Sequence, residues 1–134
     1  MLSPEQQTLL NATKEALQAQ ETTGQRTPCF GFYLDKDGMV RERSRDCARG
    51  HEEELFSWVI EQLELGVREG ATCTALLVPL ERAPEDTEGG VMVDLQHRLV
   101  GRLVGVLPWR LDRNKLAFEE ATFTSKPAVL FRAA

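Results

Sequence analysis

Three cysteines and two histidines are the side chains of this sequence best suited to chemistry, and they lie far apart along the chain. Cys47 and His51 are four residues apart, a spacing that places a thiol and an imidazole on one face of a helix start. Zinc needs three or four such ligands, and the others would have to be Cys29, Cys73 or His97 from distant strands. We therefore predict no metal site, no cofactor and no catalytic residue. A nucleophilic Cys47 activated by His51 or by nearby arginines is the alternative.

Local motifs of the common enzyme classes are missing from the sequence. It contains no GxxxxGK[ST] phosphate loop, no GxGxxG dinucleotide loop and no GxSxG nucleophile turn. His51 begins a run of glutamates, but Leu55 stands where HExxH needs its second histidine. The segment from Asp35 to Gly38 begins like a calcium loop, but Asp46 stands at the twelfth position instead of the bidentate glutamate of such loops, so it predicts a turn. These absences favour a non-enzymatic protein over an enzyme.

Arginines in alternation indicate a charged strand face. Arg41 and Arg43 are two residues apart, so they share one face if the segment is a strand. Such a face could hold an anionic ligand or an acidic partner through guanidinium groups. It could also be a solvated face that prevents edge pairing.

Further candidates for a contact surface lie between residues 97 and 110. His97 continues the inward-facing alternation of the strand before it, where a histidine is either an acid or base or a satisfied structural residue. Leu99 and Val100 are apolar where a hairpin tip should be polar, so either the strand continues or an apolar tip is exposed. Trp109 is a core residue or an interface anchor, and Arg110 follows it. The predicted interaction or ligand surface comprises Arg41, Arg43, His97, Leu99, Val100, Trp109 and Arg110.

Composition and charge limit the possible partners and compartment. The chain has 134 residues, of which 42% are hydrophobic and 28% are charged, as in an ordinary globular domain. Its net charge of −5 disfavours nucleic-acid binding, and no apolar run approaches the ~20 residues that cross a bilayer. The beginning of the chain has neither the basic nor the apolar region of a secretory signal. Three scattered cysteines favour reduced thiols, so we expect a cytoplasmic protein that contacts neither nucleic acid nor membrane.

Helix signals are clear at two places. The first helix should run from Pro4 to about residue 20, with Ser3 as its N-cap and Gln6 completing a capping box, and Gly24 should end it. The second should run from 51 to 69, closed by Gly70. Its expected buried face consists of Phe56, Val59, Ile60, Leu63 and Val67.

Strand patterns fill most of the remaining sequence. They predict strands at 29–34, 39–43, 72–80, 91–97, 103–107, 116–123 and 128–131. The order is therefore α-β-β-α-β-β-β-β-β in one domain, residues 1–134. Short connections imply an antiparallel sheet, and we predict a two-layer α+β fold with both helices on one face.

Two segments resemble known proteins. The strand, turn and return strand from Phe30 to Val40 resemble the opening hairpin of roadblock and profilin-like domains. A fifth late strand and the lack of a C-terminal helix depart from that plan. Separately, residues 93–98 followed by 106–110 resemble a group of small uncharacterised bacterial α+β proteins. That resemblance implies membership of a family without assigned activity, and it supplies no catalytic residue.

Three functions remain open from the sequence. We favour a small cytoplasmic protein-interaction or regulatory domain that is non-enzymatic and forms a homo-oligomer. The first alternative is a small-molecule-binding protein or enzyme, with a cup between sheet and helices lined by His97, Cys47, Arg41 or Arg43. The second is an immunity or antitoxin-like partner, suggested by the acidic excess over residues 52–90.

Overall fold

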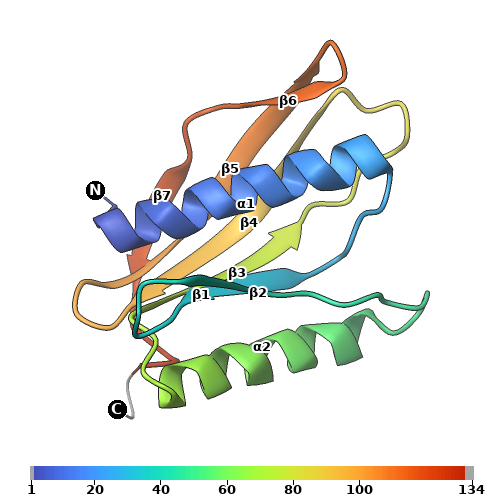
Figure 1. Ribbon diagram of the computed structural model, residues 1–134. Helices are drawn as coiled ribbons and strands as arrows, with labels where there is room; N and C mark the ends of the chain where they lie inside the picture. The colour runs from blue at the N-terminus through green and yellow to red at the C-terminus, as the bar shows by residue number, and fades with distance from the viewer. Residues whose placement is uncertain (1, 132–134) are drawn as a thin grey trace.

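A computed structural model describes residues 2–131 of the chain. Two helices and a seven-stranded antiparallel sheet make up an α+β fold, in the element order predicted from the sequence (Figure 1). The elements are α1 (Pro4–Thr23), β1 (Phe30–Leu34), β2 (Val40–Arg43), α2 (Glu52–Arg68), β3 (Cys73–Pro79), β4 (Glu88–His97), β5 (Gly101–Asp112), β6 (Lys115–Phe118) and β7 (Thr122–Lys126).

The sheet is open, and its two edges differ. The strands lie in the order β2-β1-β3-β4-β5-β6, and β7 also pairs with β5. One edge is therefore the short strand β2, while β6 and β7 follow one another along the other edge. In Figure 1, α1 crosses in front of the sheet and α2 lies beneath its β1–β2 end.

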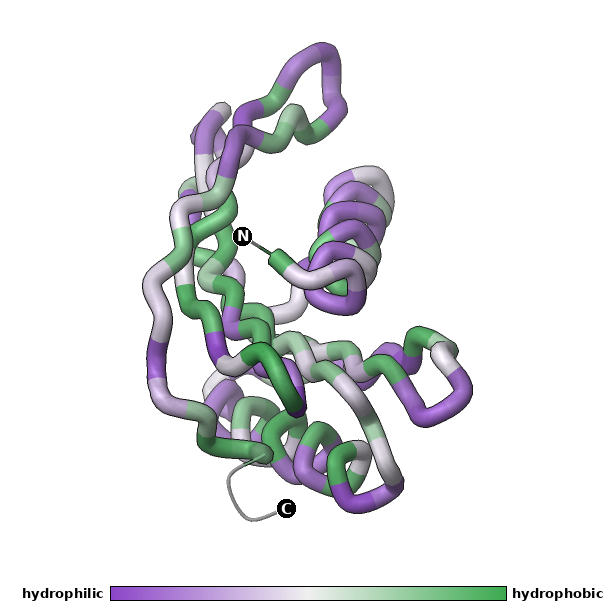
Figure 2. Tube along the Cα trace, turned by 90° about the vertical axis from the view of Figure 1, so that its left-hand side faces the viewer, coloured by the Kyte–Doolittle hydropathy of each residue, from purple (hydrophilic) through white to green (hydrophobic). Residues whose placement is uncertain are grey.

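The helices cover opposite faces of the sheet, so the predicted arrangement of both helices on one face is wrong. Phe30 and Phe32 of β1 belong to the apolar cluster under α1, whereas Tyr33 belongs to the cluster under α2. Alternate residues of a strand point to opposite faces. A Cβ added at Gly31 would lie 3.0 Å from Val59 of α2. The turned view of Figure 2 likewise separates the two helices, with strands between them. Hairpin lengths predict strand direction but not which face a helix covers.

Each helix covers its own cluster of buried apolar residues. The larger buried cluster, under α1, consists of Leu9, Leu10, Leu17, Phe30, Phe32, Leu34, Cys73, Ala75, Leu77, Val91, Val93, Leu95 and Leu107. The smaller, under α2, consists of Cys29, Tyr33, Leu55, Val59, Leu63 and Ala71. β1 and β3 contribute to both clusters because they are covered on both sides.

The ends of α1 follow the sequence prediction. The Ser3 hydroxyl accepts a hydrogen bond from the Gln6 backbone N–H, and the Gln6 side chain accepts one from the Ser3 backbone N–H. Gly24 ends the helix in the left-handed conformation, with φ of 74°, which glycine adopts without steric cost. The helix extends three residues beyond the predicted end at residue 20.

The buried face of α2 is rotated relative to the prediction. Leu55, Val59, Leu63 and Gly66 are buried, whereas Phe56 is 40% exposed. Gly66 decides this rotation, because only a residue without a Cβ can approach the ring of Tyr33 as closely as it does. Val59 and Leu63 of the predicted face are buried as expected, whereas Ile60 and Val67 are only partly buried, and Leu55 and Gly66 take the remaining buried positions.

The predicted strand at 116–123 is two strands with an irregularity between them. Trp109 pairs with Phe118 in the β5–β6 ladder, but Val106 pairs with Thr122 in the β5–β7 ladder. A regular continuation would give Val106 a partner one residue earlier, so one extra residue is accommodated as a bulge.

Pro108 lies inside β5 and does not end it as the sequence predicted. β5 extends from residue 101 to 112, past the predicted end at 107. The bulge between β6 and β7 lies opposite this proline, and the Glu119 backbone N–H donates to the Pro108 carbonyl at 2.9 Å. A bulge is a position where a sheet tolerates a residue without an N–H donor.

The predicted strand at 128–131 is absent from the structure. Instead, one side chain holds this segment: Gln96 Oε1 accepts hydrogen bonds from the backbone N–H groups of Val129 at 2.9 Å and Leu130 at 3.0 Å. Leu130 packs against the cluster under α2, and Phe131 is buried. The apolar pattern therefore reflects real burial but not strand pairing.

Candidate functional site

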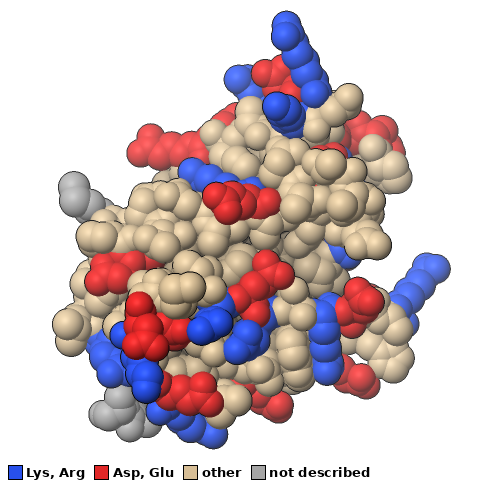
Figure 3. All heavy atoms as spheres, viewed as in Figure 1, with Lys and Arg blue, Asp and Glu red and all other residues tan. Residues whose placement is uncertain are grey.

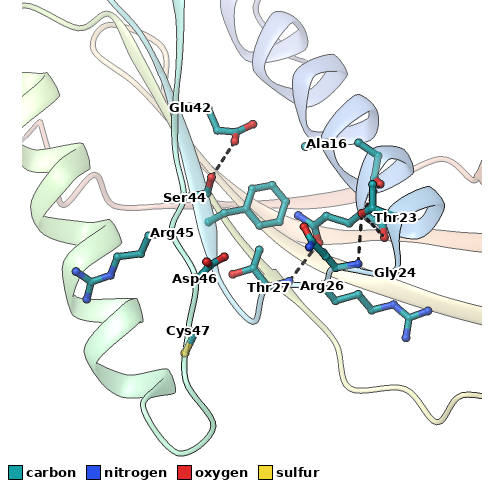
Figure 4. A pocket seen from close by; sticks show the side chains of 14 residues that line it. Ala16, Thr23, Gly24, Arg26, Thr27, Glu42, Ser44, Arg45, Asp46 and Cys47 are labelled. Atoms are coloured by element: carbon teal, nitrogen blue, oxygen red, sulfur yellow. Dashed lines mark hydrogen bonds between the residues drawn. The ribbon is translucent and has the colours of Figure 1, made fainter.

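Two adjoining hollows form a groove between α1 and the edge strand β2. Their volumes are about 920 and 560 Å³, and both are lined by Ala16 and Glu42. The larger also reaches Phe30 and the segment from Ser44 to Cys47, which follows β2 (Figure 4). We refer to the two hollows together as the α1–β2 groove.

Small side chains of α1 leave room for this groove. Ala12, Ala16 and Ala19 line it and lie at helical spacings of four and three residues, which places them on one flank of α1. Phe32 and Val40 line the sheet side of the smaller hollow. Figure 3 shows the molecular surface on this side of the sheet, where α1 lies across the front.

Backbone groups of β2 point out of the sheet along the groove. The Asp35 backbone N–H donates to the Met39 carbonyl at 2.9 Å, which makes these two residues a hydrogen-bonded pair. In an antiparallel ladder such pairs alternate, so Arg41 and Arg43 are the next residues of β2 that bond to β1. The peptide groups of Val40 and Glu42 therefore face outward.

Arg41 and Arg43 share one face, as predicted, and it is the face covered by α2. Arg41 Nε donates to Asp35 Oδ2 at 3.0 Å. Arg43 Nη2 donates to the hydroxyl of Tyr33 at 2.8 Å, and its Nη1 donates to the outward carbonyl of Glu42 at 2.8 Å. Arg43 thus covers one acceptor of the free edge and leaves the N–H groups of that edge open.

Negative side chains dominate the charge that faces the groove. Glu15, Glu42 and Asp46 line it. In Figure 4, Glu42 and Asp46 rise from β2 and its continuation, opposite the end of α1. Glu42 Oε2 accepts from the Ser44 hydroxyl at 2.8 Å, and Asp46 has no ion pair among residues 2–131.

The two arginines of the groove are occupied elsewhere. Arg26 Nη2 lies 3.3 Å from Glu21 Oε2. Arg45 stacks over the ring of Trp58 at 4.7 Å and points toward α2 in Figure 4. The three carboxylates that line the groove outnumber its two arginines, so the groove has an acidic excess.

His97 is brought close to a thiol and a carboxylate, but the geometry gives it a structural role. Cys73 is its partner across the β3–β4 ladder, and Glu5 Oε1 lies 3.4 Å from its Nε2. Its Nδ1 accepts hydrogen bonds from the backbone N–H groups of Leu99 at 3.0 Å and Val100 at 3.2 Å. In the neutral ring the proton is therefore on Nε2, and the imidazole holds the β4–β5 turn.

Cys73 does not complete a catalytic triad with His97 and Glu5. Its side chain is fully buried, and burial, followed by the negative charge of Glu5, raises its pKa to about 12. The pKa of Glu5 is lowered, first by a hydrogen bond from its own backbone N–H and second by His97. A thiol with so high a pKa supplies no thiolate near neutral pH.

The remaining residues of the predicted surface are spread over the molecule. Leu99 and Val100 are 86% and 60% exposed at the β4–β5 turn, so the exposed-tip interpretation is confirmed. Trp109 is a core residue, only 6% exposed. Arg110 lies nine residues along β5 from Gly101, about 30 Å at ~3.3 Å per residue. These residues and the β2 arginines do not form one continuous surface.

The residues of the predicted small-molecule cup do not converge. Cys47 lines the α1–β2 groove, whereas Arg41 and Arg43 lie on the α2 face and His97 is buried against Glu5. In the described part of the chain, no group of three or more His, Cys, Asp or Glu residues is placed to hold a metal ion. His51 instead pairs with Glu54 at 3.0 Å, at the start of α2.

Sequence reasoning missed the groove because its walls are brought together by strand order. Glu15 of α1 and Glu42 of β2 belong to different elements, and no local pattern places β2 at the edge of the sheet. The only local signal of the groove is the recurrence of alanine at positions 12, 16 and 19, which is also ordinary in a surface helix.

No family model, curated protein or solved structure matches this chain. Neither helix within residues 2–131 has the length and apolar composition needed to cross a lipid bilayer.

Proposed function

We propose that this protein is a non-enzymatic interaction domain that binds an extended, basic segment of a partner protein in the α1–β2 groove. The partner segment would add to the sheet as a strand next to β2. One observation carries the proposal: the outward backbone groups of β2 border a groove lined by three carboxylates that form no ion pair among residues 2–131. Strand addition at an exposed edge is a common way to recognise an extended peptide.

The dimensions of the groove set the length of the bound segment. Along α1 the lining residues run from Thr8 to Thr23, about 22 Å at ~1.5 Å per residue. At ~3.3 Å per strand residue, this length accommodates about seven residues of the partner. Alternate side chains of an added strand would point toward α1, where Glu15 and Glu42 favour lysine or arginine.

We further propose a cytoplasmic location, which the three free cysteines favour. Self-association, expected from the sequence, remains a prediction. A second copy is the competing occupant of the groove, and the apolar turn residues Leu99 and Val100 are the competing contact surface. Native mass spectrometry of the purified chain measures this directly.

The test is selection from a random nine-residue peptide library displayed on phage, followed by fluorescence anisotropy of the enriched peptides. We expect enriched sequences with basic residues at alternate positions. Glu42→Lys and Asp46→Lys should each weaken binding by about tenfold, the loss of about 1.4 kcal/mol of charge complementarity at a close contact.

Glu64→Lys is the matched control, because it makes the same charge change on α2, away from the groove. It should leave the affinity of the selected peptides unchanged. Selection of peptides without basic residues, or equal effects of all three substitutions, would contradict the proposal.

A further inference from the structure

A small, largely apolar cavity lies at the C-terminal end of α1. Its volume is about 60 Å³, and its apolar walls include Leu17, Trp109 and Leu116. The charged residues that line it are Glu21, Arg26 and Arg82. The cavity is thus bounded by α1, β5, β6 and the segment that follows β3.

Arg82 is buried here with part of its guanidinium unpartnered. Its side chain is only 9% exposed and stacks on the ring of Trp109 at 4.4 Å. Nη1 lies 3.0 Å from Glu21 Oε2, and Nη2 makes a long, 3.4 Å hydrogen bond to the Asp86 carbonyl. Nε is fully buried and has no hydrogen-bond partner among the described residues.

An unpartnered N–H of a buried cation destabilises the folded state, because no protein hydrogen bond replaces its lost hydration. Nε–H and one Nη–H of a guanidinium form a parallel pair of donors that matches the two oxygens of a carboxylate. In Arg82, Nε–H has no partner, Nη2 keeps one N–H besides the long bond to the Asp86 carbonyl, and the ion pair with Glu21 uses Nη1.

The charge and size of the cavity agree with that donor pair. Two arginines and one glutamate line the cavity, which leaves one positive charge in excess. A water needs about 10–15 Å³ of such volume, so 60 Å³ holds a group of about four to six non-hydrogen atoms. This is the size of a carboxylate with a short aliphatic tail, and the apolar walls suit that tail.

We propose that this cavity binds a small aliphatic monocarboxylate, with Arg82 Nε–H and Nη2–H donating to the two carboxylate oxygens and Trp109 packing against the tail. The most exposed lining residues, Arg26 and Leu80, mark the side from which the ligand enters. The cavity adjoins the α1–β2 groove and shares Gln20 and Arg26 with it, but Arg82 and Trp109 do not line that groove, so this proposal does not rest on peptide binding.

The test is titration of the wild-type protein with sodium propionate, monitored by the NMR signals of the Trp109 indole N–H and the Arg82 Nε–H. Propionamide, which has the same shape and no charge, is the ligand control, and sodium chloride keeps the ionic strength constant. We expect saturable shifts with propionate alone. The thermal midpoint should rise with propionate concentration as well, since the ligand binds only the folded state.

Arg82→Lys keeps the charge and a partner for Glu21 but removes the planar donor pair, so it should weaken propionate binding by about tenfold or more. Arg110→Lys is the matched control: Arg110 lies one residue from Trp109, is exposed and does not line the cavity. It should bind as the wild type does. Shifts that do not saturate, or that propionamide reproduces, would overturn the proposal without any variant.

Discussion

Gly66→Ala tests the placement of α2 against the sheet. In a solvated helix interior, alanine is more stable than glycine by about 1 kcal/mol. Here the new Cβ would lie 2.7 Å from Cδ1 of Tyr33 and 2.9 Å from two other ring atoms, well inside the ~3.5–4.0 Å of a favourable carbon contact.

The ring of Tyr33 has little freedom to move away. It is buried, and its hydroxyl accepts a hydrogen bond from Arg43 at 2.8 Å. Overpacking of a core costs about 1–3 kcal/mol. Because three ring atoms lie so close to the new Cβ, we expect Gly66→Ala to cost the upper value of this range. The higher helix propensity of alanine offsets about 1 kcal/mol of this cost. We therefore expect a net loss of about 2 kcal/mol in the free energy of unfolding, or a drop of about 8 °C in Tm.

Urea unfolding measures this change, and a second background isolates its cause. With Tyr33→Ala the obstructing ring is gone, so Gly66→Ala should then stabilise by about 1 kcal/mol, a coupling of about 3 kcal/mol between the two sites. If Gly66→Ala stabilises the protein in both backgrounds, α2 does not rest on Tyr33 and the assignment of the helices to opposite faces fails.

Two further predictions concern titratable groups. The pKa of Asp35 is lowered from 3.8, chiefly because its carboxylate accepts the Met39 backbone N–H, with smaller contributions from Arg41 and the Asp37 N–H. Its contribution to stability is therefore present above pH 3.8 and is lost as the pH falls through the lower folded-state value. The difference in Tm between wild type and Asp35→Asn should shrink on acidification, and a difference that grows would contradict this assignment. Burial raises the pKa of Cys29 and Cys73 to about 12, so an aromatic disulfide reagent at pH 8 should modify Cys47 fast and the buried pair only on unfolding. Fast reaction of all three thiols in the folded protein would be inconsistent with the buried core.

Local patterns in the sequence predict the elements of this fold well. Ser3, Gln6 and Gly24 bound α1 because capping depends on residues within a few positions of one another. Element order and antiparallel pairing also follow from local turns and short connections.

The predictions that were wrong concern features that depend on contacts between residues far apart in the sequence. The rotation of α2 follows from the fit of Gly66 against Tyr33, and the break between β6 and β7 follows from a bulge opposite Pro108. Residues 128–131 are apolar because they are buried, but the side chain of Gln96 holds them, so no strand forms.

The predicted site residues illustrate the same limit. The sequence marks His97 as a possible acid or base, yet two backbone N–H groups donate hydrogen bonds to its Nδ1. No local sequence pattern identifies Arg82, because its burial depends on Glu21 and Trp109, which come from other parts of the chain.

Strand addition at the edge of β2 can be tested by amide hydrogen exchange at the residues of this strand. Exchange would be followed by NMR with and without a peptide selected from the library. Strand addition predicts that the amides of Val40, Glu42 and Ser44, on the outward side of the ladder, become protected. Those of Arg41 and Arg43, already bonded to β1, should change little. Unchanged exchange at all five amides, or protection without this alternation, would contradict strand addition at β2.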